Sequence, residues 1–213
     1  MIAEWIDWFT QIYNVEAVVS MGGLLGMTLI VFAETGLLAG FFLPGDSLLI
    51  AAGLLTARGT FETNVFVTCT VLSIAAVVGD TVGYWFGAKT GPHLFKREKS
   101  LLFNPKHLIR THEFYEKHGG KTIIIARFVP IIRTFAPIVA GIGTMNYSRF
   151  ISYNVFGGIG WVWSMVMLGY FLGTAFPWMI ESIDKVIIVV IFISLLAMAI
   201  HYWVEKRKKP QEV

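Results

Sequence analysis

Residues 44–47 read Pro-Gly-Asp-Ser in the middle of an apolar run over 35–57, and residues 127–133 read Arg-Phe-Val-Pro-Ile-Ile-Arg inside an apolar block that begins at 122. Proline removes a helical hydrogen bond, and charged side chains are costly in lipid, so neither block is typical of an ordinary spanning helix. Irregular backbone survives at membrane depth only where it is buried in protein or lines a watery cavity. Both stretches therefore predict re-entrant hairpins.

The composition supports a membrane protein. Hydrophobic residues make up 55% of the 213 residues and charged residues only 15%, whereas soluble domains carry about 25% charged residues. This excludes a soluble enzyme and a disordered chain, and the length allows about four to six membrane segments. The lone Cys69 excludes an internal disulfide framework and a thiolate metal site.

The predicted fold is an all-α polytopic membrane protein with two inverted repeats, each made of a re-entrant hairpin and a transmembrane helix. Residues 1–16 place apolar side chains at helical spacing between polar ones, which predicts an interfacial amphipathic helix. We expect one membrane domain that continues with a first repeat (18–88), a basic loop (89–121), a second repeat (122–175), a final transmembrane helix (186–204) and a tail (205–213).

The repeat is visible in the sequence. Ala52-Gly53 is followed by Gly83-Tyr84-Trp85-Phe86-Gly87, and Ala140-Gly141 is followed by Gly169-Tyr170-Phe171-Leu172-Gly173. Each half therefore predicts a broken hairpin, a turn and a spanning helix that ends in Gly-Tyr-aromatic-x-Gly. Gly79, Gly83 and Gly87 form a glycine stripe in the first of these helices, which is typical of close helix packing.

Positive charge predicts the orientation. Of the 17 Lys and Arg residues, twelve lie within 89–121 and 206–209, and such clusters mark cytoplasmic segments rather than a nucleic-acid site. With these segments cytoplasmic, the first hairpin opens outside and the second opens to the cytoplasm. Repeats of opposite topology place transporter substrate sites at the bilayer midplane.

Five ionisable side chains lie inside the apolar blocks. Each costs about 2.5–3.5 kcal/mol at a helix centre on insertion scales, so these groups must pair, face water or lose their charge. They predict either structural ion pairs between the hairpins or a pathway for a substrate and protons. The five are Glu34, Asp46, Asp80, Arg127 and Arg133.

The two arginines are candidates for binding a substrate phosphate. Arginine keeps its charge and offers a planar fork suited to two-point contacts with phosphate. On an unbroken helix the forks of Arg127 and Arg133 would diverge, but Pro130 interrupts the helix between them. The interruption allows both forks to converge on one anion.

Glu34 and Asp46 are candidates for proton coupling, because desolvation disfavours the charged form of a carboxyl group and so promotes proton exchange near neutral pH. Asp80 is a supporting or pairing residue. Pro44, Gly45 and Pro130 are supporting residues at the two breaks in the hairpins.

No metal or cofactor is expected, and the chain is expected to be a transporter rather than an enzyme. The histidines of the basic loop match no zinc-ligand spacing. A membrane phosphatase would need a histidine nucleophile near the arginines, but residues 127–133 contain none.

Taken together, these motifs resemble the DedA family, bacterial relatives of the eukaryotic VTT-domain lipid scramblases. The resemblance covers roughly residues 20–175. It rests on Glu34 through Pro44-Gly45-Asp46, Gly79-Asp80-x-x-Gly83-Tyr84, Arg127-Phe128-x-Pro130-x-x-Arg133 and Gly141-x-x-x-Met145.

The resemblance implies an inner-membrane lipid-carrier transporter that depends on the proton motive force and returns undecaprenyl phosphate to the cytoplasmic leaflet. It places the functionally required residues on Glu34, Asp46, Arg127 and Arg133. A phospholipid scramblase or flippase, a proton-coupled ion or drug transporter for membrane homeostasis, and a non-transporting membrane organiser remain alternatives. The particular lipid, the transport direction, the proton stoichiometry, the side of the N-terminus and the oligomeric state stay open.

Overall fold

The computed structural model describes residues 22–37, 45–94, 123–124, 127 and 130–178, without the side chains of 92–94 and 130–132. Within these residues the secondary structure is helical, with no strand. The predicted interfacial helix (1–16), final span (186–204), tail and most of the basic loop lie outside the described residues, as does Pro44. The helices are α3 (Leu24–Gly36), α4 (Gly45–Ala57), α5 (Val65–Leu94), α8 (Pro130–Ile142) and α9 (Tyr147–Ala175).

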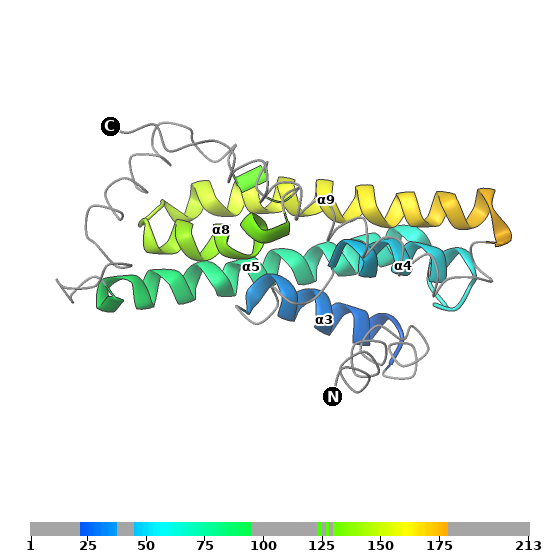
Figure 1. Ribbon diagram of the computed structural model, residues 1–213, viewed down its shortest axis with the longest axis horizontal. Helices are drawn as coiled ribbons and strands as arrows, with labels where there is room; N and C mark the ends of the chain where they lie inside the picture. The colour runs from blue at the N-terminus through cyan, green and yellow to red at the C-terminus, as the bar shows by residue number, and fades with distance from the viewer. Residues whose placement is uncertain (1–21, 38–44, 95–122, 125–126, 128–129, 179–213) are drawn as a thin grey trace, which may run out of the picture.

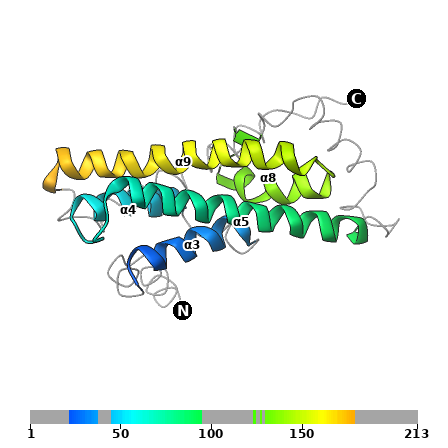
Figure 2. The same cartoon turned by 180° about the vertical axis from the view of Figure 1, so that it is seen from behind.

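Two long helices form the frame of the molecule. Helix α5 has 30 residues and α9 has 29, and they run side by side in opposite directions (Figures 1 and 2). At 1.5 Å per residue each is about 45 Å long, enough to cross the roughly 30 Å hydrocarbon core of a bilayer. They contain the predicted spans at 65–88 and 150–173, and they are the two described helices long and apolar enough to cross a membrane.

Both long helices begin at an asparagine that caps their first turn. The Asn146 side chain accepts hydrogen bonds from the backbone N–H groups of Ser148 and Arg149, at 3.0 and 3.4 Å. The Asn64 side chain accepts one from Val67 N–H at 2.9 Å. These caps satisfy backbone donors that have no partner inside the helix. They fix where α5 and α9 start.

The other three helices have 13 residues each, which gives about 20 Å and falls short of a bilayer crossing. Helix α3 packs on α5, α4 packs mainly on α9, and α8 packs on α5. In Figure 1, α4 and α8 lie toward opposite ends of the frame, and Figure 2 shows the same arrangement from behind.

Glycines bring α4 and α8 into close contact with the frame in the same way. A Cβ at Gly53 in α4 would overlap the Val166 carbonyl of α9, and a Cβ at Gly169 would overlap the Ile50 carbonyl. A Cβ at Gly141 in α8 would overlap the Tyr84 carbonyl of α5, and a Cβ at Gly87 would overlap the Ile138 carbonyl. Helices α4 and α8 therefore each pack through glycine pairs against the long helix that belongs to the other half of the sequence.

The contacts refine the repeat seen in the sequence. Gly53 and Gly141 match as the motif predicts, since both occupy the same place in these contacts. Their partners are Gly169 and Gly87, so Gly87 takes the role that the motif gives to Gly83. The sequence motif aligns Gly169 with Gly83, whereas the contacts align Gly169 with Gly87. The two alignments differ by four residues, or about one helical turn.

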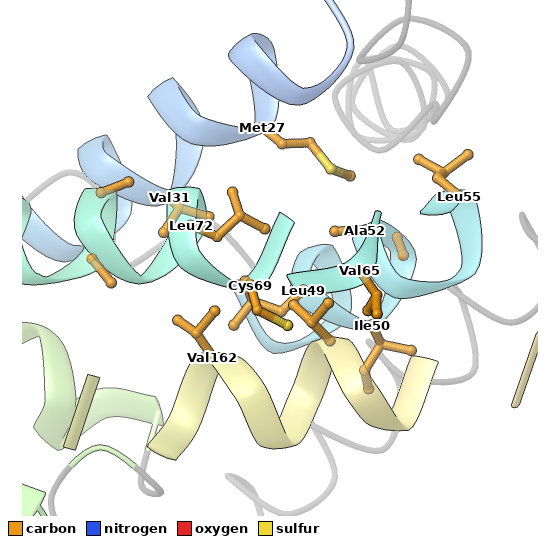
Figure 3. Packing of buried hydrophobic residues seen from close by; sticks show 14 of the residues in the cluster. Met27, Val31, Leu49, Ile50, Ala52, Leu55, Val65, Cys69, Leu72 and Val162 are labelled. Carbon is orange, nitrogen blue, oxygen red and sulfur yellow. The ribbon is translucent and has the colours of Figure 1, made fainter. Parts of the chain in front are cut away.

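The larger apolar core lies between α3, α4, α5 and α9. Its buried members include Met27, Val31, Leu49, Leu72 and Val162, with Cys69 fully buried among them (Figure 3). A smaller cluster surrounds Tyr84, which stacks on Phe150 with ring centroids 4.5 Å apart. The two clusters bury different parts of α5, around Cys69 and Leu72 in the larger one and around Tyr84 in the smaller one.

Candidate functional site

Arg133 connects two carboxylates from different helices. Its Nη2 donates to Glu34 Oε1 and its Nη1 to Asp46 Oδ1, both at 2.5 Å. The Trp161 indole Nε1–H also donates to Asp46 Oδ1, at 2.8 Å, and the Trp161 ring centroid lies 4.6 Å from Arg133 Cζ. We call these four residues the Arg133 cluster. It joins α3, α4, α8 and α9.

The break at Pro44-Gly45-Asp46 is shaped by Glu34. The Gly45 backbone N–H donates to Glu34 Oε1 at 3.2 Å, so a carboxylate from α3 caps the start of α4. A negative group at a helix N-terminus is favoured by the exposed N–H groups and by the helix dipole. A Cβ at Gly45 would overlap the Glu34 carboxylate, and only glycine leaves room for this contact.

Burial differs within the Arg133 cluster. The side chains of Glu34 and Arg133 are 1% and 7% exposed, whereas that of Asp46 is 21% exposed. Trp161 is fully buried. Asp46 is therefore the member of the cluster that meets the surroundings.

Arg127 is held in a second group, here called the Arg127 cluster. Its Nη2 donates to Asp80 Oδ2 on α5 and to Asn154 Oδ1 on α9. The Asn154 amide in turn donates to the Val77 carbonyl at 3.0 Å. All three side chains are at least nine-tenths buried. Pairing is one of the three ways in which an ionisable side chain inside an apolar block is expected to be accommodated.

A glycine pair makes room for Arg127. A Cβ at Gly157 would lie 3.0 Å from Arg127 Cδ, and one at Gly158 would lie 3.5 Å from Arg127 Nη1. The guanidinium thus lies against bare backbone of α9 between Asn154 and Trp161. Larger residues at 157 would push Arg127 away from Asp80.

The structure brings the predicted site residues together in two groups instead of one. Glu34, Asp46 and Arg133 meet directly, whereas Arg127 pairs with Asp80. Within the described residues the two arginines share no hydrogen-bonding partner. Helix α8 begins at Pro130, as its fixed backbone favours. Arg127 precedes that helix, and its N–H closes a turn onto the Ile124 carbonyl at 3.3 Å.

Sequence reasoning missed Trp161 and Asn154. Both lie in α9, in a stretch interpreted only as a spanning helix. An amide inside such a stretch is a usable signal, because a buried amide needs hydrogen-bonding partners. The indole N–H gives a weaker signal, since tryptophan is common in membrane helices for its apolar ring.

Both clusters retain unused polar atoms. Among the described residues, Glu34 Oε2, Arg133 Nε and Arg127 Nε are buried without a hydrogen-bond partner. Each carboxylate of the Arg133 cluster uses a single oxygen, which accepts two hydrogen bonds. The Arg133 cluster therefore has one donor and one acceptor available to an additional group, and the Arg127 cluster has one donor.

Comparison with known proteins identifies similar chains. The VTT domain profile matches residues 43–171, which include Asp46, Asp80, Arg127, Arg133 and both residues missed from the sequence. No solved structure shows a significant match.

The similar chains include bacterial proteins that are named as membrane proteins. The Protein DedA of Escherichia coli K12 is 48% identical over 179 residues, 84% of this chain and 81% of the relative. A membrane protein of Mycobacterium leprae is 42% identical over 174 residues, 82% of this chain and 77% of the relative. The inner membrane protein YqjA of Escherichia coli K12 is 37% identical over 168 residues, 78% of this chain and 75% of the relative.

Proposed function

Because the chain belongs to the DedA family of VTT-domain membrane proteins, we propose that it is a flippase driven by the proton motive force. Its proposed substrate is undecaprenyl phosphate, returned across the bacterial inner membrane. This assigns a transporter rather than an enzyme, with a lipid phosphate and protons as the bound species.

The observation that carries the proposal is the Arg133 cluster, in which one guanidinium bridges two carboxylates. With both carboxylates ionised the cluster has a net charge of 1 − 2 = −1, which repels a phosphate. Each proton taken up by Glu34 or Asp46 removes one negative charge. Phosphate binding at Arg133 and protonation of its partners therefore favour each other, which is the linkage that a proton-coupled anion transporter requires.

The backbone supports the same chemistry. The Arg133–Asp46 ion pair joins the first turns of α8 and α4, so the N-termini of both short helices lie at the cluster. Helix N-termini favour anions through their free N–H groups and the helix dipole. Broken helices that end at a charged site are also the usual construction of secondary transporters.

Arg127 is proposed as a second phosphate contact, with Asp80 as its supporting partner. Asp80 and Asn154 hold Arg127 at rest, so the cluster is neutral and buried. The substrate would meet Arg133 first, because Asp46 gives that cluster its exposed edge.

We also propose the inverted topology. The reciprocal packing of α4 on α9 and of α8 on α5 supports two repeats of opposite orientation. The basic loop and the C-terminus would be cytoplasmic, by the positive-inside rule. The first hairpin would then open outside and the second to the cytoplasm.

The experiment is movement of undecaprenyl phosphate between leaflets of proteoliposomes, with and without an imposed pH gradient. We expect gradient-dependent movement by the wild type, loss in Arg133→Ala, and normal movement in Arg58→Ala, which removes an exposed arginine from the 58–64 connection. Normal movement in Arg133→Ala contradicts the phosphate role of Arg133.

The same assay separates the alternatives. Movement that ignores the gradient identifies a scramblase. Movement of phospholipid but not of undecaprenyl phosphate assigns another lipid. Competition by cations at Asp46 favours an ion or drug transporter, and inactivity toward all of these with intact folding favours a membrane organiser.

A further inference from the structure

Trp161 and Arg133 aim two N–H groups at one oxygen atom. Trp161 Nε1 lies 2.8 Å from Asp46 Oδ1, and Arg133 Nη1 lies 2.5 Å from the same atom. The donors come from different helices, α9 and α8, and they converge from two directions. Asp46 Oδ1 therefore occupies a small oxyanion position.

Of the two carboxylates in the Arg133 cluster, Asp46 is the one better placed to move away from Arg133 and Trp161. Glu34 is 1% exposed, and its Oε1 is held by both Arg133 and the Gly45 N–H. Asp46 is 21% exposed, and its described contacts all go through Oδ1. Turning the Asp46 side chain outward frees two donors without disturbing Glu34.

Trp161 itself is fixed. It is fully buried, and it lies on α9 between the glycines that receive Arg127 and the residues that pack on α4. Its ring faces the Arg133 guanidinium at 4.6 Å, a distance at which the ring attracts a cation. The indole N–H would be left buried and unpaired once Asp46 departs, and such a donor gains strongly from an anionic acceptor.

We propose that Trp161 is a phosphate-positioning residue: its Nε1–H and Arg133 Nη1 together receive one phosphate oxygen in the place that Asp46 Oδ1 holds at rest. This inference rests on the proposed function and adds a neutral donor to its arginines. The ligand class is the one that the proposed function supplies, a phosphate monoester with an apolar tail, of which this position would take one oxygen.

The test measures binding of dodecyl phosphate to the full chain in a neutral maltoside detergent, with dodecyl maltoside as the uncharged control. The variant Trp161→Phe removes the N–H and keeps a ring under Arg133. Trp163→Phe makes the same change two residues away, where the ring centroid lies 6.0 Å from that of Phe66. Thermal unfolding of both variants establishes that they fold.

We expect about tenfold weaker dodecyl phosphate binding in Trp161→Phe, as for loss of one hydrogen bond to a charged group, and less than twofold change in Trp163→Phe. The ¹⁵N-indole signal of Trp161 should move when wild type is titrated with dodecyl phosphate. It should already be displaced in Asp46→Ala without ligand. The role of Trp161 requires both results, because loss of Asp46 as the indole acceptor moves the signal even without a phosphate contact, whereas only a phosphate contact also lowers affinity in Trp161→Phe.

The outcomes distinguish this inference from the proposed function. Unchanged affinity in a folded Trp161→Phe, or an indole signal that ignores dodecyl phosphate, overturns the role of Trp161 and leaves a phosphate site at Arg133 standing. Absence of binding and of lipid movement in the wild type overturns the proposed function, and this inference with it.

Discussion

One oxygen atom of Glu34 holds the beginnings of two helices: Oε1 accepts hydrogen bonds from Gly45 N–H in α4, at 3.2 Å, and from Arg133 in α8, at 2.5 Å. The carboxylate is thus a cap and an ion-pair partner at once. Loss of its charge would weaken both contacts together, so the start of α4 responds to the state of Glu34.

The close contact at Gly45 predicts a strict size limit. Gly45→Ala should destabilise the protein by about 1–3 kcal/mol and abolish transport, because the new methyl group overlaps the Glu34 carboxylate. Gly160→Ala is the matched control, since a Cβ there meets nothing within 4 Å. Thermal unfolding in detergent and lipid movement in proteoliposomes measure the two effects. A stable, active Gly45→Ala protein would show that the contact is dispensable.

Because Arg133 bridges two carboxylates, we expect that a positive charge at position 133 is not enough for transport. Arg133→Lys keeps a cation, but one ammonium cannot reproduce the planar fork that contacts Glu34 and Asp46 through separate nitrogens. We expect transport to fall at least about tenfold, as for loss of one charge-assisted hydrogen bond. Arg58→Lys serves as the control on an exposed site. Full activity in Arg133→Lys would mean that a point charge is enough.

The Arg127 cluster predicts different responses of stability and transport. Arg127→Met should reduce the free energy of unfolding by about 3–5 kcal/mol, because Asp80 is left buried without its partner. Adding Asp80→Asn should recover most of that loss. Thermal unfolding and lipid transport are then compared in the single and double variants.

If Arg127 contacts phosphate, the stable double variant remains inactive. Recovery of transport together with stability would instead show that Arg127 and Asp80 form a structural ion pair, as a membrane organiser or a transporter centred on Arg133 alone would have.

The paired glycine contacts predict equal effects in the two halves. Gly53→Ala and Gly141→Ala should each destabilise the protein by about 1–3 kcal/mol, because each new methyl group overlaps a backbone carbonyl that cannot easily move. Thermal unfolding measures both, again with Gly160→Ala as control. Strongly unequal losses would contradict the equivalence of α4 and α8.

Much of the helical layout could be predicted because bilayer thickness and backbone hydrogen bonding leave few choices. The polar stretch at 58–64 separates α4 from α5 as expected, and Pro130 begins α8. Burial also required the five charges to find partners. The sequence could not specify the pairs, since Arg127 meets Asp80 and Arg133 meets Glu34 across 47 and 99 positions. Which residues pair across such long stretches of sequence is decided by how the helices pack.

The missed residues show a second limit. Averaged over a spanning helix, one amide or one indole N–H hardly changes hydropathy, so Asn154 and Trp161 are concealed within α9. Their importance depends on a single polar atom each and on the partner that packing places there. The one-turn displacement of Gly87 against Gly83 has the same origin, because several glycines in the stripe can serve a close contact and only packing selects one.

Glycine contacts join four of the five described helices into two tight pairs, α4 with α9 and α8 with α5, and the Arg133–Asp46 bond connects one pair to the other. Trp161 and Asp46 belong to one pair and Arg133 to the other. A ligand that displaces Asp46 from Arg133 would therefore also break a contact between the two pairs, while other contacts such as the hydrogen bond from Arg127 to Asn154 remain. Under the proposed function, substrate binding and loosening of the contact between the two helix pairs would be a single event.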